Sequence, residues 1–319
     1  MTRARKHLVC AEQTPYYLIT ARCVRRAFLC GEDRVTGNSY EHRRGWIEDR
    51  MRALSSLFSI EICAYAIMSN HYHLVVRLNA EDINRWSSDE VLNRWTSLFK
   101  GTLLVQRYRS GAALSSAQQQ SLDDTVAIYR QRLGSLSWFM KCLNEPIARR
   151  ANAEDHCTGH FWEARFHSKA LHSDRALITA MGYVDLNPVR AGMVNAVTAS
   201  DYTSVRSRMI LTHADIESSI QRLLDSGELL HFSVPVRPLA AFASTQASWH
   251  DDHALPLRKD EYLDLLEATG RYRLVSKRGG FGNWRRATSP RVVIDAEQWL
   301  SEVMPSATDA EQKTLTRRA

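Results

Sequence analysis

Two histidines separated by a single residue stand at positions 71 and 73, within the stretch SNHYHLVV. This stretch has the composition of a β-strand, in which successive side chains point to opposite faces. His71, His73 and Arg77 then share one face, and the apolar residues between them line the other. Two neutral imidazoles at this spacing can bind one divalent metal ion. The alternative is a pair of surface histidines at the end of a strand.

A second pair of polar side chains, Tyr183 and Asn187, lies in the stretch GYVDLNPVRAG. The pattern predicts a helix over residues 174–187, with Ser173 as its N-cap and Pro188 after its end. Residues four apart lie one above the other on a helix, so the phenol and the carboxamide would face the same site. The carboxamide oxygen could complete the coordination of a metal ion. The alternative is a half-buried core tyrosine and an asparagine that closes the helix.

The elements that must position these residues alternate between strands and helices. Alternating or β-branched runs predict strands, with a hairpin between the second and the third, and helical spacing predicts helices. The predicted order is strand 15–23, helix 41–57, strands 59–68 and 71–78, helix 89–108, loop 110–124, helix 125–152 broken or kinked at Pro146, strand 165–172 and helix 174–187. This order predicts an α+β fold of the ferredoxin-like, split βαβ type, with an antiparallel sheet and helices on one face.

The chain of 319 residues is long enough for one large domain and an appendage. We expect the main domain over residues 1–205, with an insertion at about 105–135. Residues 206–319 are expected to form a mostly helical, basic C-terminal region, and the turn-prone stretch 233–256 is a plausible linker. No internal repeat is visible.

The composition favours a soluble protein with a polyanionic partner. Lys and Arg exceed Asp and Glu by 42 to 35, a net charge of +7, which suits nucleic acid. No apolar run reaches the roughly 20 residues that a membrane helix needs, and no secretory signal is evident. The six cysteines form no CxxC pair, which favours reduced thiols. We therefore expect a cytoplasmic protein, associated with the nucleoid, and no membrane partner.

The stretch 268–294 contains seven Arg and Lys residues and no Asp or Glu. Aromatic side chains and glycines are interleaved with these charges, a pattern that suits contact with a phosphate backbone and stacking on bases. The candidate DNA-binding residues here are Arg271, Arg273, Lys277, Arg278, Trp284, Arg285 and Arg286. The alternative is a solvated basic loop.

These motifs together resemble the REP-associated tyrosine transposases, which belong to the HUH class of single-strand DNA transposases with one catalytic tyrosine. The resemblance joins SNHYH to YVDLNPVRAG through SWFMKCLNEPIARRAN and GHFWEARFHSKAL, and it covers about residues 15–206. It implies that His71 and His73 are metal ligands, that Tyr183 is the nucleophile and that Asn187 is the polar ligand one helical turn later.

The same resemblance implies a reaction and its partners. A divalent ion, Mg²⁺ or Mn²⁺, would polarise the scissile phosphate, and Tyr183 would form a 5′-phosphotyrosine bond with single-stranded or hairpin DNA. Trp162 would be a stacking surface, Arg165 a phosphate contact, and Lys169 would lie nearby. His160 departs from the arginine that is commoner at that position. A homodimer is a further expectation.

Three other interpretations remain open at this point. A DNA- or RNA-binding regulator could keep the fold without catalysis. A relaxase or replication initiator of the HUH class would more commonly carry three histidines. A structural zinc site could use His156, Cys157 and His160, although no paired CxxC accompanies them.

Overall fold

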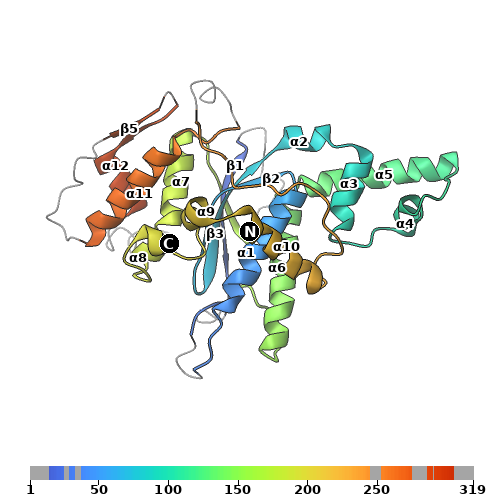
Figure 1. The fold of residues 1–319 in the computed structure, drawn as a ribbon, viewed down its shortest axis with the longest axis horizontal. Helices are drawn as coiled ribbons and strands as arrows, with labels where there is room; N and C mark the ends of the chain where they lie inside the picture. The colour runs from blue at the N-terminus through green and yellow to red at the C-terminus, as the bar shows by residue number, and fades with distance from the viewer. Residues whose placement is uncertain are drawn as a thin grey trace, which may run out of the picture.

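A four-stranded antiparallel sheet forms the centre of the molecule (Figure 1). The computed structural model describes residues 14–24, 29–32, 37–244, 253–274, 286–289 and 291–304. The sheet has the order β2-β3-β1-β4, and its strands are β1 (Tyr16–Arg22), β2 (Ile60–Ile67), β3 (His71–Leu78) and β4 (His167–Ala170). The mixed helix and strand composition and the four predicted strands are thereby confirmed.

Alternation along β3 divides its side chains between two hydrophobic cores on opposite faces of the sheet. Leu74 belongs to the larger core, which includes α1 (His42–Leu57) and α6 (Leu136–Glu154). Val75 belongs to the second core, which includes α7 (Asp174–Asp185). In Figure 1, α7 lies on one side of the sheet, and α1 and α6 lie on the other.

The expectation that the helices lie on one face of the sheet is therefore wrong. The face that α7 covers is apolar along β2, where Cys63, Ala64 and Ala66 are fully buried. The strand pairing shifts between Ile62 and Ala64, and this irregularity lets two successive residues enter the same core. A sheet face of this composition has to be covered by another layer, and α7 supplies it.

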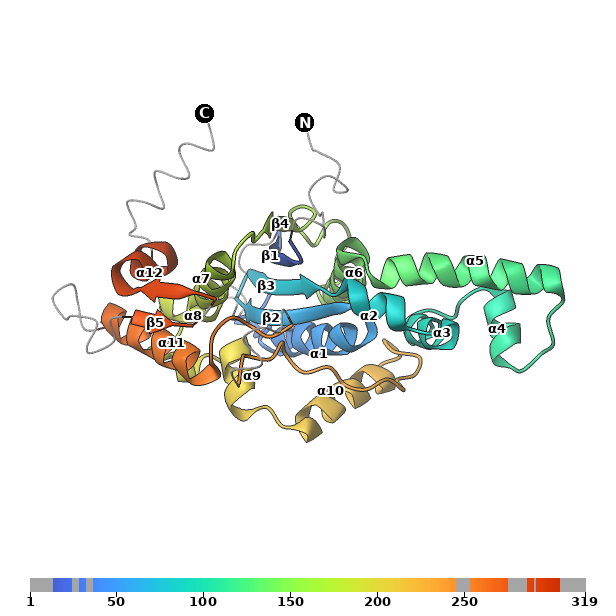
Figure 2. The same cartoon turned by 90° about the horizontal axis from the view of Figure 1, so that it is seen from above.

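Between β3 and β4 the chain forms more helix than the sequence predicted. The predicted helix 89–108 is interrupted where Gly101 adopts a φ of +74°. The predicted loop 110–124 is mostly helical, because Ser115 and Gln118 form a reciprocal capping box that starts a new helix. In Figure 2, α4 and α5 extend away from the sheet as an arm. These elements are α2 (Ala80–Arg85), α3 (Ser88–Thr96), α4 (Leu103–Arg109) and α5 (Ser116–Leu133).

Pro146 lies inside α6, which continues through it without ending. Proline has no N–H to donate to the carbonyl group four residues earlier, that of Cys142. The buried guanidinium of Arg50, on α1, donates to this carbonyl instead, with an Nε–O distance of 2.5 Å. The predicted helix 125–152 is instead interrupted earlier, between α5 and α6. There Ser135 caps α6 by accepting a hydrogen bond from the Trp138 N–H. A hydrogen bond from α1 thus satisfies the Cys142 carbonyl, and the helix does not end at Pro146 as predicted.

The elements after α7 pack against both faces of this framework. On one side, α10 lies along α1, and Arg222 donates two hydrogen bonds to the Asp49 carboxylate at 2.7 and 2.8 Å. On the other side, α12 packs against α7. These elements are α8 (Asn187–Arg190), a 3-10 helix (Val197–Ala199), α9 (Ser204–Ile210), α10 (His213–Asp225), α11 (Lys259–Leu274), β5 (Arg286–Thr288), β6 (Val293–Asp295) and α12 (Ala296–Val303).

The second core contains residues from both sides of position 205. The domain boundary at that position stays a prediction. Within the described ranges, none of the helices has the length and apolar character needed to span a bilayer.

Candidate active site

His71 and His73 occupy the beginning of β3 and lie on the face of the sheet that α7 covers. Their ring centroids are 4.8 Å apart, and the ring planes are nearly perpendicular, at 88°. In the neighbouring strand β1, Arg22 lies opposite His71 and Thr20 lies opposite His73. The predicted placement of both imidazoles on one strand face agrees with this geometry.

The Nδ1 atoms of both histidines are occupied by polar neighbours. His71 Nδ1–H donates to the Asn70 Oδ1 at 2.5 Å. His73 Nδ1 shares a hydrogen bond of 2.9 Å with the Thr20 hydroxyl. When Nδ1–H is the donor in each case, Nε2 carries the free lone pair and is the atom available to a metal ion.

Burial keeps both imidazoles uncharged at neutral pH. It lowers the pKa of His71 to about 4, and the charge of Arg22 adds to the effect. It lowers the pKa of His73 to about 3, with further contributions from His71, Arg190 and Arg22. Since only a neutral imidazole can donate a lone pair to a metal ion, the protonation state of the pair fits a metal site.

Tyr183 lies on α7 directly beside this pair. Its ring is half-buried, and its centroid is 5.7 Å from that of His73, with the planes at 84°. The guanidinium carbon of Arg190 lies over the Tyr183 ring, 4.3 Å from its centroid. The sequence predicted Tyr183 on the flank of a buried stripe, and this stripe is confirmed, because Leu177, Ala180, Met181 and Val184 are all buried.

Asn187 is buried, but it does not lie on the same helix as Tyr183. The predicted helix 174–187 ends at Asp185, and Asn187 is the first residue of the short helix α8. Pro188 has no N–H with which to continue the hydrogen-bond ladder of α7. The placement of Asn187 on a continuous helix was therefore wrong, and its role as a ligand stays a prediction.

The imidazoles of His71 and His73 offer two nitrogen donors to a divalent ion. Among the residues that the structure describes, no three His, Cys, Asp or Glu side chains are grouped so that they could hold a metal ion. This includes His156, Cys157 and His160, so the alternative of a zinc site there has no support. The Cys157 thiol instead donates to the Asn152 Oδ1 at 3.5 Å.

Gly182 and Asp185, the neighbours of Tyr183 on α7, are held by elements far along the chain. A Cβ atom at Gly182 would lie only 2.2 Å from the end of the Trp299 ring, so α12 packs directly against this glycine. Asp185 accepts hydrogen bonds from the Ser204 hydroxyl at 2.5 Å and from the Tyr262 hydroxyl at 2.7 Å. The position of the tyrosine thus depends on α9, α11 and α12.

Trp162 is half-buried, and its indole N–H donates to the Asn144 carbonyl at 2.9 Å. Its ring makes edge contacts with Tyr72 and Phe161, so packing is part of its role. It also lines a cavity of about 750 Å³ between α6 and the segment 159–166, as does the exposed Arg165.

Two further candidate DNA contacts are exposed to solvent. Lys169 lies on the edge strand β4, opposite Leu18. Arg271, on α11, forms an ion pair with Glu267 at 2.6 Å.

The remaining candidates lie in or near the basic C-terminal stretch. Arg273 belongs to α11 and Arg286 to β5. Lys277, Arg278, Trp284 and Arg285 lie outside the described residues. Their role in DNA binding stays a prediction.

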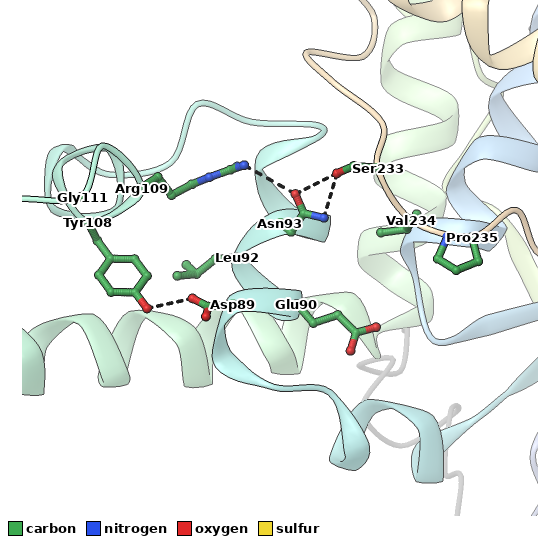
Figure 3. A pocket seen from close by; sticks show the side chains of 10 residues that line it. All are labelled: Asp89, Glu90, Leu92, Asn93, Tyr108, Arg109, Gly111, Ser233, Val234 and Pro235. Carbon is green, nitrogen blue, oxygen red and sulfur yellow. Dashed lines mark hydrogen bonds between the residues drawn. The ribbon is translucent and has the colours of Figure 1, made fainter.

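A second cavity, of about 720 Å³, lies far from the histidines along the chain (Figure 3). It is formed by α3, α4 and the segment 233–235. Tyr108 donates to the Asp89 carboxylate at 2.8 Å, and Asn93 donates to the Ser233 hydroxyl at 2.9 Å. None of the predicted site residues lines it.

Sequence reasoning missed Thr20, Arg22 and Arg190 as members of the histidine cluster. Arg190 stands in the same GYVDLNPVRAG stretch as Tyr183, and this proximity was the signal that could have found it. Thr20 and Arg22 share a face of β1 by alternation, but only the strand register shows which residues of β3 they meet.

No protein-family model matches this chain, and no curated protein matches it either. Among solved structures, the chain is similar to a REP-associated tyrosine transposase bound to a REP hairpin. The identity is 12%, the match covers 75% of this chain and 96% of that chain, and the TM-score is 0.33.

Proposed function

We propose that this protein is a metal-dependent transposase or endonuclease that cuts and rejoins single-stranded DNA through a covalent bond to Tyr183. The observation that carries the proposal is the edge contact between the Tyr183 ring and His73, one of two neutral imidazoles on the same strand face. A nucleophile candidate and a metal-binding pair therefore meet at one point, although they come from separate elements. The strand order β2-β3-β1-β4 supports the finer assignment of the sheet to the ferredoxin-like plan.

In this proposal His71 and His73 would hold the metal ion, and Asn187 would supply an oxygen ligand. Mg²⁺ or Mn²⁺, when bound, would supply charge that polarises the phosphate and stabilises the transition state. The Tyr183 hydroxyl attacks the phosphorus atom, so that a bond forms between its oxygen and the 5′ phosphate. The bond from phosphorus to the 3′ oxygen breaks, that oxygen takes up a proton, and the phenol proton is lost to solvent. The adduct keeps the energy of the phosphodiester, so a 3′-hydroxyl can reverse the step.

The DNA would reach this site along the β4 edge of the sheet. Arg165 and Lys169 are exposed near the edge strand. The cavity beside Trp162 lies on the α6 face of the sheet, opposite His71 and His73, so the DNA would have to pass around this edge to contact both. Hairpins or palindromic repeats are the expected substrates. Light scattering at several protein concentrations would test the predicted homodimer.

The test of the proposal is the formation of a denaturant-resistant adduct with DNA. Labelled single-stranded hairpins from the genomic flanks of the gene are incubated with the protein and Mg²⁺ or Mn²⁺. The wild type is expected to form the adduct, and Tyr183→Phe to form none. Tyr108→Phe is the matched control, because this tyrosine lines the second cavity and should leave the adduct unchanged.

Persistence of the adduct in Tyr183→Phe would overturn the mechanism. No adduct in the wild type, across metals and substrates, would do the same. Retained binding of the hairpin in that case would favour a regulator without catalysis.

Thr20→Val is expected to weaken metal binding about 10-fold, because loss of a polar partner behind a ligating histidine has effects of this size. Valine keeps the shape of threonine but removes the hydroxyl that meets His73 Nδ1. The measurement is the Kd for Mn²⁺ by titration calorimetry, with Thr20→Ser as the control that retains the hydroxyl. Equal Kd values for Thr20→Val and the wild type would contradict the role given to Thr20.

A further inference from the structure

Arg190, at the end of α8, faces the cluster of Tyr183 and His73 from the side of the tyrosine ring. Its guanidinium carbon is 4.3 Å from the centroid of that ring, a cation–π distance. The residue is half-buried, and its Nη1 atom is buried without a hydrogen-bond partner in the described part of the chain. A cationic donor is therefore enclosed at the edge of the candidate active site.

The other arginines with a buried nitrogen of this kind have partners that Arg190 lacks. Arg208 donates to the Ala240 and Cys63 carbonyls at 3.0 and 2.8 Å. Arg77 and Arg237 pair with Glu61 and Asp82 respectively, so a carboxylate offsets each charge. Arg206 lies 3.6 Å from Asp201. Among the described residues no carboxylate lies within ion-pair distance of Arg190, and its guanidinium donates no hydrogen bond.

A half-buried guanidinium without an acidic partner carries a cost in free energy, because the charge has lost part of its hydration. A phosphate group removes that cost, since its oxygens accept charge-assisted hydrogen bonds from the guanidinium fork. The neighbours of Arg190 here are the Tyr183 ring and His73, and neither is a carboxylate that could pair with it. The surroundings thus select an anion that arrives with the substrate.

We propose that Arg190 binds a non-bridging oxygen of the scissile phosphodiester and is a further catalytic residue of this site. The proposal rests on the function proposed for Tyr183. Stacking on the phenol ring fixes the guanidinium beside the nucleophile, so the phosphorus is held next to the oxygen that attacks it. The guanidinium of Arg190 stabilises the negative charge that develops on the phosphoryl oxygens.

The first test compares adduct formation by the wild type, Arg190→Gln and Arg190→Lys. Removal of one such donor is expected to slow the reaction roughly 100-fold, and lysine is expected to restore part of the rate. Arg149→Gln is the matched control, because Arg149 is an exposed arginine of α6 that pairs with Glu145. Far-UV circular dichroism and the unfolding midpoint show that each variant is folded.

A modified substrate separates a phosphate contact from a purely structural role. In a methylphosphonate at the scissile position, a methyl group replaces the non-bridging oxygen and its charge. With this substrate Arg190→Gln and the wild type are expected to react at equal rates. A 100-fold difference that persists would show that Arg190 acts only on the structure of the site, and it would overturn the proposal.

A binding measurement keeps this proposal distinguishable from the function proposed for Tyr183. In the Tyr183→Phe background, binding of a labelled single-stranded oligonucleotide is measured at several salt concentrations. Loss of one phosphate contact should reduce the slope of log K against log salt by about 0.7. An unchanged slope in Arg190→Gln overturns the role of Arg190, whatever the outcome of the adduct experiment. A reduced slope without any adduct supports the phosphate contact and removes the catalytic step.

Discussion

Replacing Asp185 by alanine is expected to lower the free energy of unfolding by about 3–5 kcal/mol, the cost of removing one member of a buried charged network. The carboxylate is fully buried and accepts hydrogen bonds from the Ser204 hydroxyl, the Val205 N–H and the Tyr262 hydroxyl. Alanine would leave all three donors without an acceptor inside the protein. The half-buried Arg208 guanidinium would also lose the favourable interaction with the Asp185 charge.

The isosteric change Asp185→Asn separates the hydrogen bonds from the charge. The amide oxygen can still accept from Ser204 and Val205, and the amide nitrogen can donate to the Tyr262 oxygen once that hydroxyl turns. The expected loss is about 1 kcal/mol. Urea unfolding followed by circular dichroism measures both variants. Equal losses for alanine and asparagine would contradict the argument that the three donors dominate.

Gly182→Ala is expected to destabilise the protein by about 2 kcal/mol, a typical cost of overpacking, despite the better helix propensity of alanine. The added Cβ would lie 2.2 Å from Cη2 and 2.6 Å from Cζ2 of Trp299. The indole cannot swing aside freely, because it is buried and its N–H donates to the Thr269 hydroxyl at 2.9 Å. The shift falls on α7, next to Tyr183, so the rate of adduct formation should fall as well.

A double-mutant cycle tests whether the contact with Trp299 is the cause. Trp299→Ala alone is expected to cost about 3–5 kcal/mol, because it empties the space of a large buried side chain. In that background Gly182→Ala should be neutral or slightly stabilising, since the alanine methyl then meets no ring. The same loss in both backgrounds would show that another contact restricts position 182.

Much of the fold could be predicted because apolar side chains recur at strand and helix spacing along the chain. The alternation around His71 and His73 defined both the strand and the face on which the imidazoles lie. The spacing of Leu177, Met181 and Val184 defined the buried side of α7. These patterns depend only on near neighbours, so one sequence is sufficient to find them.

The predictions that were wrong depended on contacts between distant parts of the chain. A proline at position 146 usually ends a helix, and here Arg50 satisfies the carbonyl that proline leaves free. The capping box at Ser115 was visible in the sequence, but the small and polar residues around it suggested a loop. The register irregularity in β2, which places both Cys63 and Ala64 against the second helical layer, is not revealed by any periodicity.

The candidate site was also predicted only in part, because some of its members come together through contacts between distant segments. His71, His73 and Tyr183 were found from two short motifs, and the resemblance brought these motifs together. Placing Arg190 required the position of α8 after the end of α7, which the sequence did not predict. The contacts of Trp299 with Gly182 and of Tyr262 with Asp185, which hold the helix of Tyr183, could be found only from the tertiary structure.

The packing of α12 on α7 also has a consequence for the order of events during synthesis. A ribosome releases α7 long before it reaches Trp299, so the nascent chain carries this helix without its final cover. Contacts between segments so distant in sequence form late, because the closure of a long loop precedes any gain from them. The proposed cleavage activity is thus expected to appear only once α12 has been made, and a message truncated before α12 would yield an inactive product.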